Sequence, residues 1–293
     1  MELRTLKYFL VVAREGSLTK AAKYLHVTQP TLSVQMKQLE EELGKQLFTR
    51  SNYSINLTVE GMKLKKRAED ILELVDKTVD EIKNLSTVNG VIQIGSSESV
   101  NLLDVVKIFK EFRERYPSVS FDLYSGDTKR MEERISSGLM DFAIISQPQV
   151  DLEKYNYLVI PKKDVWGVLM RKDDSLACKD HLIIDDIIER NLIVSRQSMK
   201  EDLPKWFENR IDGIKVVATY DLIYNASLFV KEGMGIALAF EGIVDISEES
   251  DLCFRRLYPQ LDTEMYIIWK RHAHLSEASQ LLLDELKAKF KNL

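Results

Sequence analysis

The stretch from Ser17 to Leu39, SLTKAAKYLHVTQPTLSVQMKQL, constrains the fold most strongly, because it predicts two short helices joined by a tight turn. The first helix is predicted over 18–25, and residues 26–28 form the turn. The hydroxyl of Thr28 can cap the second helix, and Pro30 is compatible with a first helical turn, where no intrahelical N–H is required. The pattern is that of a helix-turn-helix.

The second of these helices has one apolar face and one polar face. Its apolar residues recur at three- or four-residue spacing, which predicts that they face inward. They are Leu32, Met36, Leu39 and Leu43. The other face carries mostly short or polar side chains and a single charge, which suits the reading of base edges in a major groove. Its members are Pro30, Thr31, Ser33, Val34, Gln35 and Lys37.

The flanking segments complete a small helical unit with a β-wing. A preceding helix is predicted over 3–14, with an apolar stripe that faces the other two helices. Gly44 ends the second helix of the helix-turn-helix. The segment 49–58, TRSNYSINLT, has turn formers and partly alternates apolar and polar residues, which predicts a small wing. Arg50 stands where such a wing approaches DNA phosphate.

Together these residues resemble the winged helix-turn-helix of LysR-type transcriptional regulators. The match runs through about the first sixty residues at the spacing of the family, which is more specific than a lone helix-turn-helix pattern. Its motifs are Leu6-x-x-Phe9, Ser17-Leu18-Thr19-x-Ala21-Ala22-x-x-Leu25, Val27-Thr28-Gln29-Pro30-Thr31-Leu32-Ser33, Leu39-Glu40-x-x-Leu43-Gly44, Leu47-Phe48-x-Arg50 and Leu57-Thr58-x-x-Gly61. The alternative, a helical hairpin in the core of an enzyme, would require a more apolar outward face.

The resemblance implies binding of promoter DNA through the second helix and the wing, by a homodimer or a homotetramer. The DNA contacts carried over by position are Gln29, Pro30, Thr31, Ser33, Gln35 and Arg50, and Thr28 and Lys37 complete the predicted set. Many family members have a basic residue where this chain has Val34, so one phosphate or base contact is missing here. RNA polymerase is a further implied partner.

The net charge of −5 argues against nucleic-acid binding until its distribution is considered. Residues 1–60 hold 8 Lys and Arg against 6 Asp and Glu, and no later segment of the chain has a positive excess. Neutralisation of phosphates supplies much of the affinity for DNA, so one copy with so small an excess should bind weakly. We therefore expect two or more copies to act together.

Nothing in the sequence predicts export or membrane insertion. The apolar run 8–13 is too short for a secretory signal, and Arg14-Glu15 follows it instead of a small-residue cleavage site. No stretch has the length of a membrane span. Cys178 and Cys253 give no disulfide framework and are expected to be reduced thiols. We expect a cytoplasmic protein.

A long helix is predicted after the wing. Gly and Pro are absent from 62–88, and apolar residues recur there at alternating spacings of four and three. This heptad seam predicts pairing with a second chain, as the linker helix of the family does. The predicted dimerisation residues in the seam are Leu64, Ala68, Ile71, Val75 and Ile82, and Thr78 and Leu85 complete it. The alternative is a surface helix that lies on its own domain.

After Asn89-Gly90, strands and helices alternate, which predicts a parallel sheet covered by helices. The predicted strands are 91–94, 119–124, 142–145, 166–170, 192–195, 216–219, 236–239 and 265–269, and the predicted helices are 100–116, 129–137, 203–209, 221–232 and 276–291. The fold class is therefore α/β overall, with a mainly α N-terminal region and a long linker helix.

This half also resembles, more loosely, the two-lobed effector domain of the same family, which is related in fold to periplasmic solute-binding proteins. The motifs are Ser96-Ser97, Arg115-x-Pro117, Gly138-x-x-Asp141-Phe142-Ala143-Ile144 and Val230-x-x-Gly233-x-Gly235-Ile236-Ala237. The predicted domains are 1–58 for DNA binding, 59–89 for the linker helix and 90–293 for effector binding, with lobe one of 90–161 and 267–293 and lobe two of 162–266. The chain is expected to cross between lobes near 160–163 and 263–267.

Polar residues follow the predicted strands at their C-terminal ends, where a fold of this type binds its ligand. They are Ser96, Ser97, Glu98, Gly126, Asp127, Thr128, Ser146, Gln147, Ser195, Arg196, Gln197 and Asp221. Helix N-termini, nearby hydroxyls and Arg196 favour a small polar or anionic ligand. Glu98, Asp127 and Asp221 are equally compatible with an amine or with the capping of helices.

No catalytic constellation stands out. The chain has no Gly-x-Ser-x-Gly elbow and no phosphate-binding glycine loop, so no cofactor is expected. His272-x-His274 lacks nearby Cys or acidic partners, so no metal is predicted.

The sequence does not distinguish an activator from a repressor, or a dimer from a tetramer. We expect a transcriptional regulator controlled by a small ligand; the alternative is a solute-binding or enzymatic protein on the same two-lobed fold, against which 1–89 argues.

Overall fold

The computed structural model describes residues 1–50, 55–83, 88–146, 153–200, 203–208 and 210–291. The chain forms two compact units, Met1–Leu85 and Ser86–Leu293. Each has hydrophobic cores of its own. The second unit contains two lobes.

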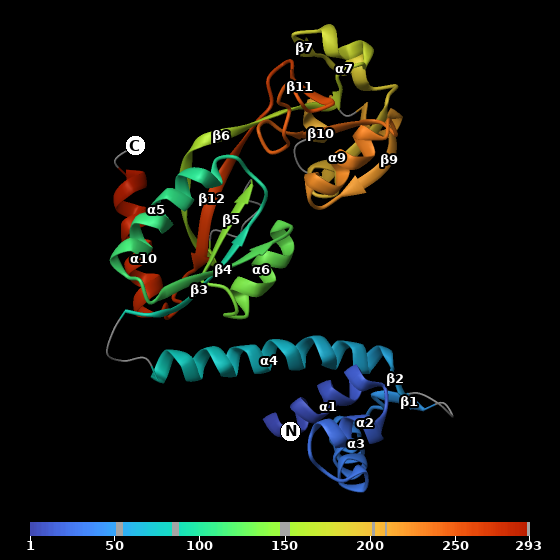
Figure 1. Ribbon diagram of the computed structural model, residues 1–293, viewed down its shortest axis with the longest axis vertical. Coiled ribbons are helices and arrows are strands. Elements are labelled where there is room, and N and C mark those ends of the chain that lie inside the picture. The colour runs from blue at the N-terminus through green and yellow to red at the C-terminus, as the bar shows by residue number, and fades with distance from the viewer. Residues whose placement is uncertain (51–54, 84–87, 147–152, 201–202, 209, 292–293) are drawn as a thin grey trace. The chain divides into compact units, whose positions relative to one another are not determined.

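The first unit combines three packed helices, a two-stranded wing and a long fourth helix (Figure 1). Its elements are α1 (Leu3–Glu15), α2 (Leu18–Tyr24), α3 (Gln29–Leu43), β1 (Phe48–Arg50), β2 (Ile55–Leu57) and α4 (Val59–Lys83). The hydroxyl of Thr28 accepts a hydrogen bond from the N–H of Thr31 at 3.3 Å, so the predicted cap of α3 is present. Gly16 and Gly44 follow α1 and α3 in the left-handed conformation that ends many helices.

The apolar stripe of α3 faces the core of the first unit, except at its last position. Leu32, Met36 and Leu39 are at most 1% exposed. Phe9 of α1 and Phe48 of the wing meet in the same core, with ring centroids 5.3 Å apart. Leu43 is 40% exposed, so its predicted inward position is wrong, because it is the final residue of α3 and lies beyond the last turn that packs on the core.

The first part of α4 belongs to the core of its own unit. Ala68 is fully buried there, and Leu64 and Ile71 pack against the same cluster. The prediction that Ala68 contacts a second chain is therefore wrong, because α1 already covers this face of the helix. Val75 is half-buried, while the side chain of Ile82 lies outside the described part of the chain.

The second unit is built on one long sheet with the strand order β4-β3-β5-β12-β6-β10-β8-β9. Its strands are β3 (Gly90–Ser96), β4 (Val119–Ser125), β5 (Phe142–Ser146), β6 (Tyr155–Arg171), β7 (His181–Leu182), β8 (Asn191–Ser195), β9 (Lys215–Tyr220), β10 (Ile236–Phe240), β11 (Leu252–Leu257) and β12 (Asp262–Lys270). The helices are α5 (Leu102–Arg115), α6 (Thr128–Ser136), α7 (Ile184–Ile187), α8 (Leu203–Trp206), α9 (Ile223–Lys231) and α10 (Glu277–Lys291), with short 3-10 turns η1 (Ser175–Cys178), η2 (Ser198–Lys200) and η3 (Arg210–Gly213).

Two strands join the lobes, as Figure 1 shows for β6 and β12. β6 pairs with β12 up to Val165 and with β10 from Trp166 onward. The exchange of partners therefore lies between these two residues in β6 and just before Asp262 in β12. The predicted crossings, 160–163 and 263–267, fall within the same two strands but are displaced from the exchange by a few residues. The predicted crossing in β6 coincides with the exposed polar stretch 161–163, whereas the exchange of partners comes just after it, because the strand continues through this stretch in its pairing with β12.

Several elements differ from the predicted ones. β6 begins at Tyr155, eleven residues before the strand predicted at 166, and β11 was not predicted. The helix predicted over 203–209 ends at Trp206, because Glu208 adopts a left-handed conformation, with φ of 52°, that a helix cannot accommodate. The parallel pairing predicted for the sheet holds for β3 with β4 and β5, and for β8 with β9 and β10. β6 and β12 are antiparallel to their neighbours.

Candidate DNA-binding surface and effector cleft

The predicted DNA-binding residues of α3 lie on its accessible face. Thr28, Gln29, Pro30, Thr31 and Lys37 are exposed, and Ser33 and Gln35 are half-buried. Val34, where the basic residue of many family members is missing, is exposed on the same face. Three of these side chains make contacts within this segment: the hydroxyls of Thr28 and Thr31 are 2.7 Å apart, and Lys37 pairs with Glu41 at 3.4 Å. A surface ion pair of this kind is weak enough for phosphate to replace it.

The wing stands next to α3 in the chain and is joined to it through the loop 44–47. Arg50, the last residue of β1, lies opposite Ile55 of β2. Its side chain lies outside the described part of the chain, so the predicted phosphate contact rests on the position of the backbone alone. The N–H of Ile55 donates to the carbonyl of Gly16 at 2.9 Å, which fastens the wing to the turn between α1 and α2.

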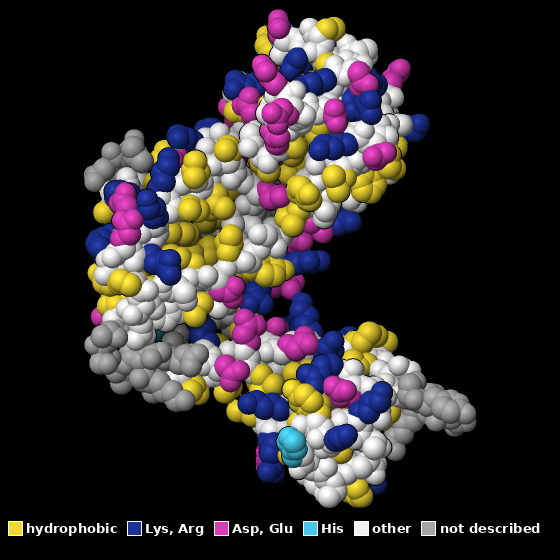
Figure 2. All heavy atoms as spheres, in the orientation of Figure 1, with side chains coloured by type: hydrophobic (Ala, Val, Ile, Leu, Met, Phe, Trp, Pro, Cys, Tyr) yellow, Lys and Arg dark blue, Asp and Glu magenta, His cyan; other side chains and the backbone are white. Residues whose placement is uncertain are grey.

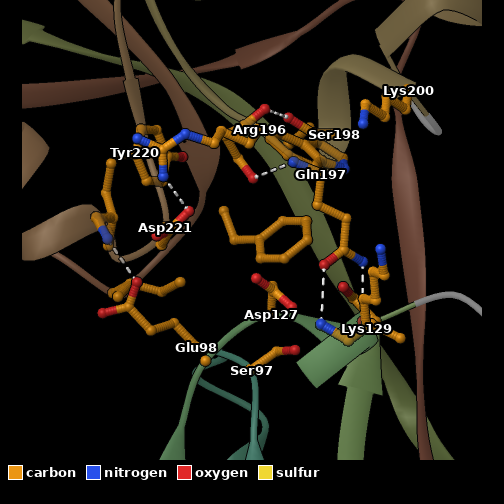
Figure 3. A pocket seen from close by; sticks show the side chains of 18 of the residues that line it. Ser97, Glu98, Asp127, Lys129, Arg196, Gln197, Ser198, Lys200, Tyr220 and Asp221 are labelled. Carbon is orange, nitrogen blue, oxygen red and sulfur yellow. Dashed lines mark hydrogen bonds and ion pairs between the residues drawn. The ribbon is translucent and has the colours of Figure 1, made fainter. Parts of the chain in front are cut away.

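A cavity of about 580 Å³ lies between the two lobes of the second unit. Its lining includes residues at or just after the C-terminal ends of β3, β4, β5, β8 and β9, as predicted for such folds. Figure 3 shows several of them, among them Ser97, Asp127 and Arg196, around the cavity. The predicted residues that line it are Ser97, Glu98, Gly126, Asp127, Thr128, Ser146, Ser195, Arg196, Gln197 and Asp221. Ser96 does not line it, because this residue is 2% exposed and its hydroxyl donates to the carbonyl of Ser97 at 2.8 Å. Gln147 lies outside the described residues.

Two sets of hydrogen bonds cross between the lobes beside this cavity. The side chain of Gln197 bonds to both the hydroxyl and the N–H of Thr128, at 2.9 and 3.3 Å. Glu98, after β3, accepts a hydrogen bond from the N–H of Ile223 at the start of α9, at 2.5 Å. Burial raises the pKa of Glu98, and the bond from Ile223 partly offsets this.

Two of the predicted charged residues, Arg196 and Asp127, already make polar contacts within the protein. Arg196 pairs with Asp221 at 2.5 Å, as the dashed line in Figure 3 marks, so part of its charge is already neutralised. Asp127 accepts a hydrogen bond from the N–H of Arg130 at 2.8 Å and caps α6. The capping alternative considered for these acidic residues is thus correct for Asp127.

Sequence reasoning missed the apolar side of the cavity. The additional lining residues are Lys129, Glu132, Trp166, Ser198, Lys200, Tyr220, Ile223, Phe240 and Ile243. Trp166 of β6 and Phe240 of β10 were not predicted to line the cavity, and their ring centroids lie 4.4 Å apart. The indole N–H of Trp166 donates to the hydroxyl of Thr263 at 2.8 Å, which fixes this wall. Strand patterning cannot distinguish core from cavity lining, since both require apolar residues.

Ser97 supplies a polar group with no bond of its own in the cavity. Its hydroxyl oxygen is buried and has no hydrogen-bond partner among the described residues. Buried polar groups are nearly always hydrogen-bonded in folded proteins. An unsatisfied hydroxyl in a cavity wall is therefore a natural contact for a bound molecule.

A buried carboxylate stands close to the point where β6 passes between the lobes. One oxygen of Asp164 accepts hydrogen bonds from Ser99 and from Asn101, both at 2.9 Å. Its other oxygen has no partner among the residues that the structure describes. Burial raises the pKa of Asp164 to about 6, and the two hydrogen bonds oppose this shift only in part. Asp164 thus holds the loop that follows Ser97 and Glu98.

Other candidate chemistry is weaker. No group of three or more His, Cys, Asp or Glu side chains suited to a metal ion is found among the described residues, so His272 and His274 have no such companions there. Cys178 is exposed, whereas Cys253 is buried, and burial raises the pKa of its thiol. Within the described ranges, no helix is both long and apolar enough to cross a membrane.

Comparison with known families decides what this architecture is. Residues 3–62 match the family described as bacterial regulatory helix-turn-helix protein, lysR family, and residues 86–291 match the LysR substrate binding domain. The chain belongs to the LysR family of transcriptional regulators. It is thus a DNA-binding regulator with an effector-binding domain, and the predicted fold class is confirmed.

Relatives of this LysR regulator match it over most of its length. It is 30% identical to the HTH-type transcriptional regulator YtlI of Bacillus subtilis strain 168, over 81% of this chain and 77% of that protein. It is 29% identical to YofA of Bacillus velezensis, over 98% of both. Among solved structures, the LysR family regulator CbnR has a TM-score of 0.77 at 19% identity, covering 99% of both chains, which shows the shared fold.

Proposed function

We propose that this LysR regulator binds a small ligand in the cavity between its lobes and that the ligand alters its binding to promoter DNA. The observation that carries the proposal is the lining of the cavity by both lobes, next to the hydrogen bonds that join them. A ligand that touches both lobes binds one relative arrangement better than another, and that difference is what shifts the equilibrium.

The cavity favours a ligand with a polar or anionic end and an apolar body. One side offers hydroxyl groups, among them the unsatisfied hydroxyl of Ser97, and lysines at 129 and 200 add positive charge from each lobe. The other side offers the rings of Trp166 and Phe240. A thermal-shift screen of small carboxylic acids and amines against the full-length chain tests this preference. Stabilisation by amines and not by acids would contradict it.

For DNA binding, we propose that the contacting residues are those predicted on α3 together with Arg50 of the wing. The exposure of five of the eight, Thr28, Gln29, Pro30, Thr31 and Lys37, supports this assignment. A gel shift with the promoter beside the chain's own gene, at low and high salt, tests it. A solute-binding or enzymatic protein on the same fold would give no sequence-specific band. CbnR has been solved in complex with its target DNA, which gives a precedent within the fold.

We further propose a homodimer or homotetramer, supported by apolar surfaces that one chain leaves exposed. On α4, Leu74 and Val79 are 40% and 39% exposed. In the second unit, α5 and the edge strand β4 form an apolar groove of about 740 Å³ with Val106 and Leu123 at its surface, and Figure 2 shows apolar side chains gathered over this part of lobe one.

The opposite edge of the same sheet carries a second exposed apolar surface. β9 and α9 present Val217, Tyr224 and Phe229, which are 36%, 70% and 42% exposed. A two-fold axis that places lobe one of one copy beside lobe two of another would bury both surfaces twice, which is why we assign a second copy as the occupant. Sedimentation of the full-length chain tests the oligomer.

The remaining assignments follow from membership in the family. We propose that residues 1–58 bind DNA, that 59–89 link and dimerise, and that 90–293 bind the effector. Contact with RNA polymerase, action in the cytoplasm and the absence of enzymatic activity complete the proposal. Reconstituted transcription with purified RNA polymerase, with and without the regulator, would test the polymerase contact.

A further inference from the structure

The side chain of Glu40 holds the loop between the recognition helix α3 and the wing. Its Oε1 accepts hydrogen bonds from the N–H groups of Leu47 and Phe48, at 2.7 and 3.2 Å. Hydrogen bonds to an ionised acceptor are among the stronger ones in proteins. Glu40 is in the last turns of α3, and Phe48 is the first residue of the wing strand β1. The two hydrogen bonds therefore join the recognition helix directly to the start of β1.

The same short segment is held from its other side by the start of α4. The carbonyl of Leu47 accepts a hydrogen bond from the N–H of Thr58 at 3.0 Å. The hydroxyl of Thr58 donates to the carbonyl of Gln46 at 2.8 Å and accepts from the N–H of Gly61 at 2.9 Å. A Cβ at Gly61 would lie 2.1 Å from the carbonyl oxygen of Leu47, so α4 approaches the segment as closely as a glycine allows.

Residues 46–48 thus form a connection between two helices and the wing. The side chains of Leu47 and Phe48 are 2% and 9% exposed and lie in the core of the first unit, so the connection is anchored on both its polar and its apolar sides. A rigid connection of this kind fixes the position of β1 relative to α3.

Glu40 adds a negative charge to a DNA-binding unit with so small a positive excess. A negative charge near phosphate lowers affinity. Its carboxylate is half-buried and bonded to the backbone, whereas Glu42, two residues later, is exposed and pairs with the amino terminus. This difference indicates that the hydrogen bonds of Glu40 to the backbone offset the loss of DNA affinity that its negative charge causes.

We propose that Glu40 is a positioning residue for DNA binding, which sets the wing and the start of α4 against the recognition helix without contacting DNA. This role rests on the proposed function in one respect: the predicted loss of affinity assumes that the wing contacts DNA. Because two charge-assisted hydrogen bonds are at stake, their loss should weaken DNA binding by about tenfold.

Four substitutions separate position from charge. Glu40→Ala removes both the charge and the acceptor, so it should speed exchange at both amides. Glu40→Asp keeps the charge but shortens the side chain by one methylene, so it cannot reach both N–H groups. Glu40→Gln removes the charge but keeps an acceptor oxygen at the same reach. Glu42→Ala removes an equal charge from an exposed position of the same helix and serves as the matched control.

Two measurements on the full-length chain decide the proposal. Amide hydrogen exchange at Leu47 and Phe48, followed by NMR in the free protein, reports the bonds themselves. Affinity is measured on a duplex selected from a random-sequence pool by the wild-type chain. We expect Glu40→Asp to speed exchange at both amides and to weaken binding, while Glu40→Gln and Glu42→Ala keep slow exchange and bind at least as tightly as the wild type.

Two results would overturn the proposal. One is wild-type exchange and affinity in Glu40→Asp. The other is tighter binding by both Glu40→Ala and Glu40→Gln with unchanged exchange, which would show that Glu40 acts only through its charge. Arg50→Ala on the same duplex tests the wing contact separately: if it leaves affinity and its salt dependence unchanged, the assignment of Arg50 fails, and the exchange data still decide the role of Glu40.

Discussion

The side-chain amide of Gln197 and the hydroxyl of Thr128 lie 2.9 Å apart across the cavity that separates the two lobes. Gln197 follows β8 in lobe two, and Thr128 opens α6 in lobe one. With the bond between Glu98 and Ile223, this pair joins the two lobes. The lobe arrangement therefore depends on a few hydrogen bonds that a ligand can strengthen or replace.

Removal of the Gln197 amide should loosen the lobes. In Gln197→Leu the N–H of Thr128 loses its acceptor, which now lies at 3.3 Å. A neutral hydrogen bond contributes about 0.5–1.5 kcal/mol, so the open population should rise by roughly 2- to 12-fold. Amide exchange at Thr128 would report it. Gln280→Leu removes an amide that bonds only within α10 and should leave this exchange unchanged.

The hydroxyl of Ser97 should matter to ligand and not to folding. It makes no hydrogen bond within the described structure, so Ser97→Ala should change the free energy of unfolding by less than about 0.5 kcal/mol or increase it. The same variant should lose most of the thermal shift produced by any acid found in the screen. Ser96→Ala, which removes a hydroxyl that is already bonded, is the control for the ligand response. An undiminished shift in Ser97→Ala would remove this residue from the site.

Asp164 should make stability depend on pH. Burial raises its pKa from 3.8 to about 6, so the folded state binds the proton more tightly than the unfolded state. Stability must then fall as pH rises from about 4 to 6, and the loss is complete above that range. Asp164→Asn removes this loss while keeping an oxygen that Ser99 and Asn101 can bond.

We expect Asp164→Asn to match the wild type near pH 4 and to exceed it by about 1–3 kcal/mol at pH 7.5, the upper value being the full pKa shift. Urea unfolding at the two pH values measures the difference. Asp122→Asn, at an exposed position of β4, should stay within about 0.5 kcal/mol of the wild type at both. Equal gains for the two variants would show that net charge, and not the burial of Asp164, is responsible.

The sequence predicted the cavity well on its polar side, for a physical reason. Residues that follow the ends of parallel strands meet at one edge of a sheet, so Ser97, Thr128 and Ser195 could be grouped without knowing how the lobes are folded. The partner of each charge could not be predicted in this way. That Arg196 pairs with Asp221, and that Glu98 reaches Ile223, depends on contacts between segments far apart in the chain.

The linker helix shows the same limit more sharply. The heptad spacing correctly predicted a long helix with an apolar seam, but spacing does not reveal which neighbour covers each position. Ala68 packs into the core of its own unit, while Val75 is half-buried and Thr78 is exposed. The part of the seam around Ala68 therefore lies on its own domain, which was one of the two alternatives for this helix. The later part is available to pair with a second chain, which was the other.

This division predicts different outcomes for two substitutions on α4. Val75→Glu places a charge beyond the part of the seam that packs on the first unit, so it should yield folded monomers that bind DNA weakly, since one copy has little positive excess. Ala68→Glu places a charge in the core of the unit and should unfold it, as a buried unpaired charge does. Sedimentation and circular dichroism distinguish the two results.

The control for Val75→Glu is Asp76→Asn, at an exposed position beside Val75, which should behave as the wild type. If Val75→Glu remained a folded oligomer with unchanged DNA binding, α4 would not be the element that pairs the chains.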